Sequence, residues 1–152
     1  MSNAVHYVTM PGNPVDGAAV TNQFGAPPVH RRVLVAEDEF DLRILLQEHL
    51  AQQGYEVLLA EDGVRAMRMI HESRPDLIIL DYAMPRMTGY QVLAELHQHP
   101  ELAAVPVIIL TGAAGPLPME FASVHGARRY VKKPFDLAEL DQHIQAVLRE
   151  TP

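Results

Sequence analysis

The stretch LIILD at residues 77–81 is a run of four aliphatic side chains that ends abruptly in the carboxylate of Asp81. Proline stands shortly before it, at Pro75, and shortly after it, at Pro85. A short apolar run between such breaks predicts a strand that is buried on both faces, as the central strands of parallel sheets are. In open α/β sheets, ligands bind outside the carboxyl ends of the strands. We therefore expect Asp81 to lie at a functional edge of a sheet.

Two further apolar runs bring polar groups to the same edge. Residues 32–36 (RVLVA) are followed by the acidic cluster EDE at residues 37–39, and the run VIIL at residues 107–110 is followed by Thr111. Because the carboxyl ends of parallel strands meet at one edge, we expect these acids and this hydroxyl to share one site with Asp81.

Strands and helices alternate along the chain from Arg31 onward. Apolar runs predict strands at residues 32–36, 56–60, 77–81, 106–110 and 127–131. Helices are predicted at about residues 39–53, 63–73 and 89–98, with a short fourth helix from about Pro118 and a last one after Asp136. Gly54 is expected to end the first helix, and Asp136 with Glu139 to form a capping box. This alternation predicts an α/β fold with a doubly wound, five-stranded parallel sheet.

The N-terminal residues 1–30 are rich in proline and glycine and have no hydrophobic period, which predicts a disordered or loosely attached tail. The folded domain is then expected to span residues 31–150. The whole chain of 152 residues has no cysteine and a net charge of −7. The missing cysteines exclude disulfides and thiolate metal sites, and the negative charge argues against direct nucleic-acid binding. No apolar run reaches the roughly 18 residues of a membrane span, so we expect a cytoplasmic protein without a membrane partner.

The motifs together resemble the receiver domain of two-component response regulators, over about residues 31–150. The matching segments are VAED at residues 35–38, ILD at 79–81 with MP at 84–85 and Gly89, LT at 110–111, and YVKKPF at 130–135. Each segment alone is common, but all of them in this order and spacing are specific to that family. The resemblance implies a (βα)5 flavodoxin-like fold. It also implies a phosphorelay signalling domain, rather than an enzyme, that takes a phosphoryl group from a phosphohistidine.

The resemblance gives the site residues individual roles. Asp81 would be the phosphoryl acceptor, Asp38 a direct Mg²⁺ ligand, Glu37 a ligand through water, and the backbone carbonyl of Ala83 a further ligand. Thr111 would hydrogen-bond a phosphoryl oxygen, and Lys133 would pair with the acceptor or its phosphoryl group. Tyr130 would be the switch aromatic. It also implies a cis peptide bond between Lys133 and Pro134.

The chemistry of the residues supports these roles independently. Three carboxylates at one strand edge repel each other and are costly without a cation. Ligand oxygens without histidine or cysteine suit a small, hard ion such as Mg²⁺. Phosphoryl transfer needs an oxygen nucleophile and positive charge on the transferred group. Asp81 supplies the nucleophile, while Mg²⁺ and Lys133 supply the charge.

The first predicted helix carries a candidate docking surface. Its core face is expected to be filled by Leu42, Leu45, Leu46 and Leu50. Phe40 and Ile44 should then be partly exposed beside the acids, where they could dock a partner helix. The resemblance implies that the chain has a histidine kinase or a histidine phosphotransfer protein as a partner, while the sequence does not identify the downstream protein target.

Two other classes of protein share parts of this pattern. A phosphatase of the haloacid-dehalogenase type needs a second aspartate two residues after its nucleophile, where this chain has Ala83. A flavodoxin-like carrier must bind a phosphate in its first loop, which residues 37–39 would repel.

The chain ends soon after its last predicted helix, so we expect a stand-alone receiver. A receiver domain taken from a larger hybrid kinase or effector-bearing regulator is the alternative.

Overall fold

The computed structural model describes residues 30–112 and 126–151. The predicted N-terminal tail, up to residue 29, and the predicted fourth helix lie outside these residues. In the described part of the chain, no helix is both long enough and apolar enough to cross a membrane.

The described residues form five strands that pair in one parallel sheet, in the order β2-β1-β3-β4-β5. The strands are β1 (Arg32–Ala36), β2 (Glu56–Ala60), β3 (Leu77–Asp81), β4 (Val107–Thr111) and β5 (Ala127–Lys132). The helices are α1 (Phe40–Gln52), α2 (Gly63–Ser73), α3 (Gly89–Gln98) and α5 (Leu137–Glu150). The predicted parallel sheet is confirmed, with β4 beginning and ending one residue later than expected.

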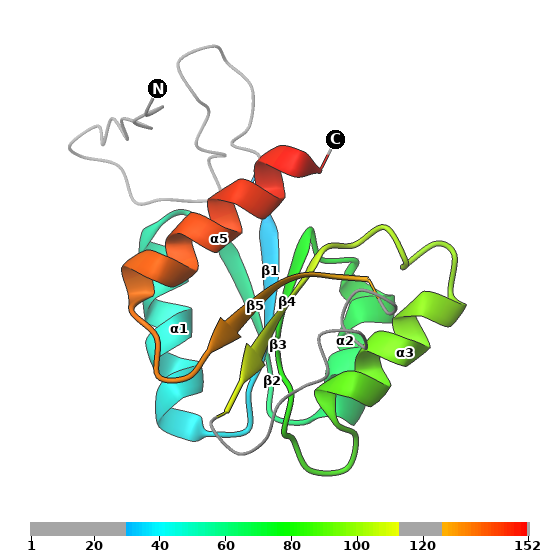
Figure 1. The fold of residues 1–152 in the computed structure, drawn as a ribbon. Helices are drawn as coiled ribbons and strands as arrows, with labels where there is room; N and C mark the ends of the chain where they lie inside the picture. Colours follow the sequence, from blue (N-terminus) through cyan, green and yellow to red (C-terminus); the bar gives the residue numbers. More distant parts are fainter. Residues whose placement is uncertain (1–29, 113–125, 152) are drawn as a thin grey trace, which may run out of the picture. The chain divides into compact units, whose positions relative to one another are not determined.

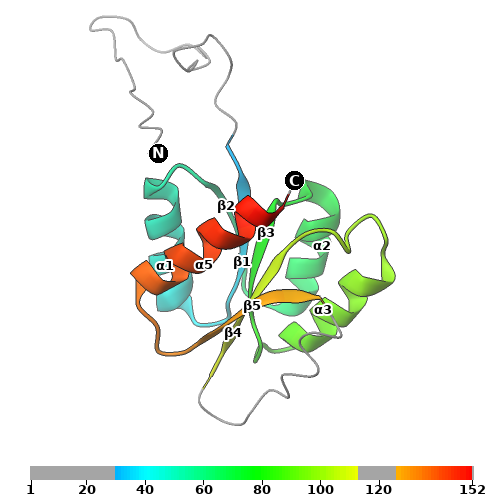
Figure 2. The ribbon, with the colours of Figure 1, turned by 45° about the horizontal axis from the view of Figure 1, so that its top comes forward.

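Helices cover both faces of the sheet, α1 and α5 on one and α2 and α3 on the other (Figures 1 and 2). Successive side chains of a strand point to opposite faces, so β3 serves both layers. Leu77 and Ile79 pack with α1 and α5, whereas Ile78 and Leu80 pack with α2 and α3. All five residues of β3 are buried, as the sequence predicts for a central strand.

The helix ends follow local sequence signals with one exception. Gly54 follows α1 with a φ of 92°, which glycine adopts without strain, as predicted. The capping box predicted from Asp136 and Glu139 is wrong, because the side chain of Asp136 makes no capping hydrogen bond. Both side chains are exposed, so water can satisfy the first N–H groups of α5. A capping box does form at α3, between Thr88 and Gln91.

The core face of α1 is narrower than predicted. Leu46 and Leu50 are fully buried and Leu42 is partly buried, but Leu45 is 46% exposed. Apolar residues lie around most of this helix, so their pattern does not decide which of them faces the sheet. The contact with α5 and the sheet decides it instead, and Leu45 is left on the surface.

This difference between neighbouring leucines is measurable. Leu46→Ala should lower the free energy of unfolding by about 2–5 kcal/mol, because it leaves a cavity in the core. Leu45→Ala is the matched control and should cost less than about 1 kcal/mol, because its side chain already meets water. Urea unfolding of the two variants checks this, and equal losses would contradict the assignment of the core face.

Candidate functional site

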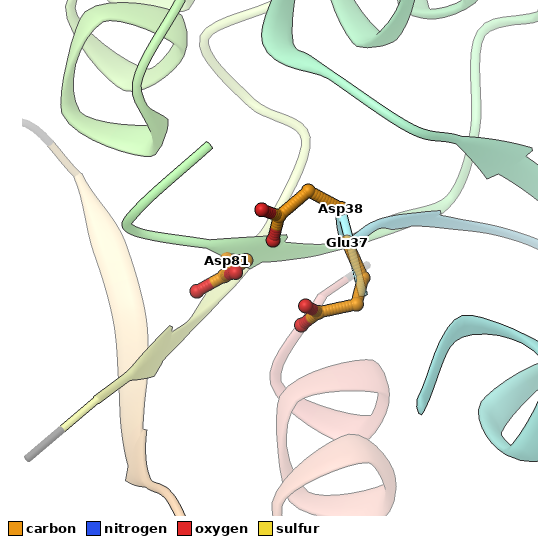
Figure 3. A group of neighbouring side chains, drawn as sticks. All are labelled: Glu37, Asp38 and Asp81. Carbon is orange, nitrogen blue, oxygen red and sulfur yellow. The ribbon is translucent and has the colours of Figure 1, made fainter. Parts of the chain in front are cut away.

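Three carboxylates meet at the carboxyl edge of the sheet. Ala36 at the end of β1 pairs with Leu80 of β3, so Glu37 and Asp38 leave the sheet beside Asp81. One ligand oxygen from each of these three residues lies within 4.8 Å of the others, and Figure 3 shows the side chains turned into a common space. Glu37 and Asp81 are buried at 0% and 4% exposure, whereas Asp38 is exposed. The structure thus brings together the three acids that the sequence predicts.

Lys133 is the cation that faces this cluster. Its Nζ lies 2.8 Å from Glu37 Oε2 and 3.3 Å from Asp81 Oδ2, so it contacts Glu37 more closely than the predicted acceptor. The backbone N–H of Lys133 donates to the carbonyl of Thr111 at 2.7 Å, which fixes the end of β5 against the end of β4. The Lys133–Pro134 peptide bond is cis, as predicted.

The acids and the lysine change each other's protonation. Burial, and after it the negative charge of Glu37, raises the pKa of Asp81 to about 7 against the opposing effect of Lys133. Burial also acts to lower the pKa of Lys133, but its bonds to Glu37 and Asp81 outweigh burial and raise that pKa. The ammonium therefore stays charged, and it offsets only part of the repulsion among the carboxylates.

The loop from β3 to α3 is packed closely against the site. The N–H of Ala83 lies 3.4 Å from Asp81 Oδ1, which places the Ala83 backbone beside the cluster. The N–H of Gly89 donates to the carbonyl of Tyr82 at 2.8 Å. A Cβ atom at Gly89 would lie 2.3 Å from the carbonyl oxygen of Asp81, so a side chain there would displace the backbone of Asp81.

The start of α2 supports this loop, and the sequence analysis does not predict that contact. A Cβ atom at Gly63 would lie 2.1 Å from the carbonyl oxygen of Met87, so only glycine allows this approach. Asp62 accepts from the N–H of Arg65 at 2.8 Å, and its other oxygen lies 3.8 Å from Nε of Arg86. The sequence feature that could have indicated this support is the pair Asp62-Gly63 before an amphipathic helix, because aspartate at this position is typical of a helix start.

The remaining predicted residues lie on β4, β5 and α1. Thr111 is the last residue of β4 and is half-buried, and no hydrogen bond joins its hydroxyl to Asp81 in the part of the chain that the structure describes. Tyr130 is half-buried on β5 and packs against the core on the α2 and α3 side, where burial raises its pKa. Phe40 at the start of α1 is 64% exposed and Ile44 is partly buried.

The donor set fits a small divalent cation. It consists of carboxylate oxygens only, and the one ammonium beside them leaves excess negative charge. Hard ions such as Mg²⁺ prefer such oxygens, and they bind through one or two carboxylates while keeping several waters. Two buried acids beside an exposed one leave the cluster open to water on one side.

Comparisons with known proteins agree with this arrangement. A family model described as the response regulator receiver domain matches residues 33–145. The probable transcriptional regulator ycf27 of Guillardia theta is 40% identical over 121 residues, which are 79% of this chain and 46% of that protein. The alkaline phosphatase synthesis transcriptional regulatory protein PhoP of Bacillus subtilis is 32% identical over 81% of this chain and 50% of that protein. The chain thus spans about half the length of the curated relatives it matches.

A solved structure adds a metal to the comparison. The receiver domain of a sensor histidine kinase from Pseudomonas aeruginosa is 30% identical, with a TM-score of 0.72 over 80% of this chain and 99% of that one. In that structure a magnesium ion is coordinated in the active-site cleft.

The raised pKa of Asp81 makes the metal-free protein less stable at higher pH. In the unfolded chain this carboxyl loses its proton near 3.8, but in the folded chain it keeps it up to about 7. The folded state therefore binds more protons in this range, and its contribution to stability is lost as the pH rises through the range. With chelator present, Asp81→Asn should melt at a higher temperature than the native chain at pH 8, and the difference should narrow toward pH 4.

Asp136→Asn is the control, because it neutralises an exposed carboxylate that makes no capping hydrogen bond. Its melting temperature should follow that of the native chain across this pH range. An Asp81→Asn variant that melts below the native chain at pH 8 would contradict the assignment of the raised pKa.

Proposed function

The chain belongs to the response regulator receiver domains, and on that premise we propose that Asp81 is the phosphoryl acceptor of a two-component phosphorelay. The observation that carries the proposal is the position of Asp81. It is a buried carboxylate at the end of the central strand, with the Lys133 ammonium 3.3 Å from its Oδ2. We also infer that the domain assists its own phosphorylation and dephosphorylation and does not act on a separate substrate.

The proposed reaction is an in-line displacement at phosphorus. An oxygen of the Asp81 carboxylate attacks the phosphorus of a phosphohistidine, a phosphorus–oxygen bond forms, and the phosphorus–nitrogen bond breaks. The electron pair of the broken bond remains on the imidazole nitrogen of the donor. Burial of Asp81 removes water from the nucleophile, and the raised pKa of its carboxyl shows how strongly the site resists the charged form without a cation.

The proposed metal ligands are Asp38 directly, Glu37 through water, Asp81, and the carbonyl of Ala83. Bound there, Mg²⁺ would supply the positive charge that favours the ionised carboxylates and offsets the charge of the transferred phosphoryl oxygens. The convergence of the three acids supports this ligand set.

Three further residues have proposed roles around the acceptor. Lys133 pairs with Asp81 before transfer and with a phosphoryl oxygen afterwards, because its ammonium already reaches Asp81. Thr111 donates its hydroxyl to a phosphoryl oxygen from the end of β4. Tyr130 turns inward behind it as the switch aromatic. The backbone bond between Lys133 and Thr111 supports a coupled response of β4 and β5.

The proposed docking face for a histidine kinase or histidine phosphotransfer protein is the exposed side of α1. Phe40 is exposed there and Ile44 is partly so. Leu45 is also exposed on α1, and it lines a groove with Leu42, Phe135 and Leu137 that includes neither Phe40 nor Ile44. An apolar groove beside the acids suits a partner helix that must bring its phosphohistidine close to Asp81. We propose a cytoplasmic location, where such kinases present their phosphohistidines.

The acceptor is tested by mass. Incubated with acetyl phosphate and Mg²⁺, the native chain should gain the mass of one phosphoryl group, and Asp81→Asn should gain none because the amide is not a nucleophile. Asp41→Asn is the control, since it makes the same change in an exposed residue of α1 and should be phosphorylated normally. Phosphorylation of the Asp81→Asn variant would refute the assignment.

The metal is tested by melting. Binding to the folded state alone should stabilise the native chain by about 1.4 kcal/mol when Mg²⁺ is tenfold above its dissociation constant. Asp38→Ala should abolish this Mg²⁺-dependent rise in the melting temperature. An unchanged rise in that variant would place the ion elsewhere.

A further inference from the structure

Arg43, on the second turn of α1, holds the backbone of the loop that carries two of the acids. Its Nη1 lies 2.8 Å from the carbonyl oxygen of Glu37 and 3.3 Å from that of Asp38. This nitrogen bears two N–H groups, so it can donate one to each carbonyl. The guanidinium carbon lies 5.5 Å from the centroid of the Phe40 ring, within the range of a cation–π attraction that helps to orient it.

Asp38 needs such a support more than the other two acids do. The Glu37 carboxylate is fixed by the Lys133 ammonium at 2.8 Å and by the N–H of Glu39 at 3.1 Å. The Asp81 carboxylate is buried and also faces Lys133. The Asp38 carboxylate is exposed, and it accepts no hydrogen bond from any residue that the structure describes. The orientation of the Asp38 carboxylate therefore depends on the position of the Asp38 backbone. Arg43 holds that backbone by donating to its carbonyl oxygen.

We infer that Arg43 is a positioning residue that keeps Asp38 turned toward the cation site. The inference rests on the proposed function only for the identity of the cation. The hydrogen bonds of the Arg43 guanidinium within the described residues go to backbone oxygens and to none of the three carboxylates. Arg43 acts through two backbone carbonyls, those of Glu37 and Asp38.

Calorimetric titration with Mg²⁺ tests this role. Arg43→Gln, whose shorter neutral side chain lacks the guanidinium, should weaken Mg²⁺ binding by about tenfold, the usual effect of losing one charge-assisted hydrogen bond. Arg43→Lys keeps the charge but not the planar guanidinium that reaches both carbonyls, so its dissociation constant should lie between the native value and that of Arg43→Gln. Arg68→Gln is the matched control, because it removes an exposed arginine of α2 that only pairs with Glu72 and should leave Mg²⁺ binding unchanged.

A second readout separates positioning from a general loss of structure. The metal-free melting temperatures of Arg43→Gln and Arg68→Gln should be similar. The rate of phosphorylation by acetyl phosphate is then measured as a function of Mg²⁺ concentration. In Arg43→Gln the Mg²⁺ concentration that gives the half-maximal rate should rise, but the maximal rate at saturating Mg²⁺ should stay within about twofold of the native rate.

Three outcomes would overturn the inference. They are native Mg²⁺ affinity in Arg43→Gln, an equal loss in Arg68→Gln, and a maximal rate that stays low when Mg²⁺ is saturating. Failure of the proposed function would look different, since the native chain would then gain no mass from acetyl phosphate while the calorimetric comparison still stands.

Discussion

Mutual repulsion of Glu37, Asp38 and Asp81 is the constraint on which the other features of the site depend. A parallel sheet brings the ends of β1 and β3 side by side, and one ligand oxygen from each of the three acids lies within 4.8 Å of the others. One ammonium, that of Lys133, lies between two of them, and the pKa of Asp81 is still raised to about 7. The folded chain thus stores unfavourable electrostatic energy that a divalent cation, or protonation of Asp81, would relieve.

Keeping the carboxylates together requires a rigid backbone around them. The strands supply part of it, because β3 is buried along its whole length. Close backbone approaches supply the rest, and glycine at Gly63 and Gly89 allows the β3–α3 loop to lie directly against α2 and Asp81. The exposed side of the site has less support. Within the described residues, Arg43 contacts Asp38 through the main-chain carbonyl and not through the carboxylate. The site is therefore most closely packed around Asp81, which is buried, and least closely packed around Asp38, which is exposed.

The sequence predicts the features that depend on local pattern, and it fails where packing decides. Four aliphatic residues before Asp81 determine a buried strand and its polar end, so the sheet and the acidic edge follow from the sequence. Leu45 was misplaced because apolar residues lie on most sides of α1, so their pattern does not define a single inner face. The closer contact of Lys133 with Glu37 could not be foreseen, since the sequence shows which charges share an edge but not which atoms meet. Arg43 was missed because its bonds go to backbone oxygens, which no residue pattern displays.

A crystal structure with Mg²⁺ and beryllium fluoride tests the central claim most directly, because beryllium fluoride mimics a phosphoryl group on a carboxylate. We expect the beryllium fluoride adduct on an oxygen of Asp81, with the metal between it and Asp38 and with the Lys133 ammonium moved from Glu37 toward a fluorine. An adduct on another carboxylate, or a metal bound away from these acids, would show that Asp81 is not the acceptor at a cation site.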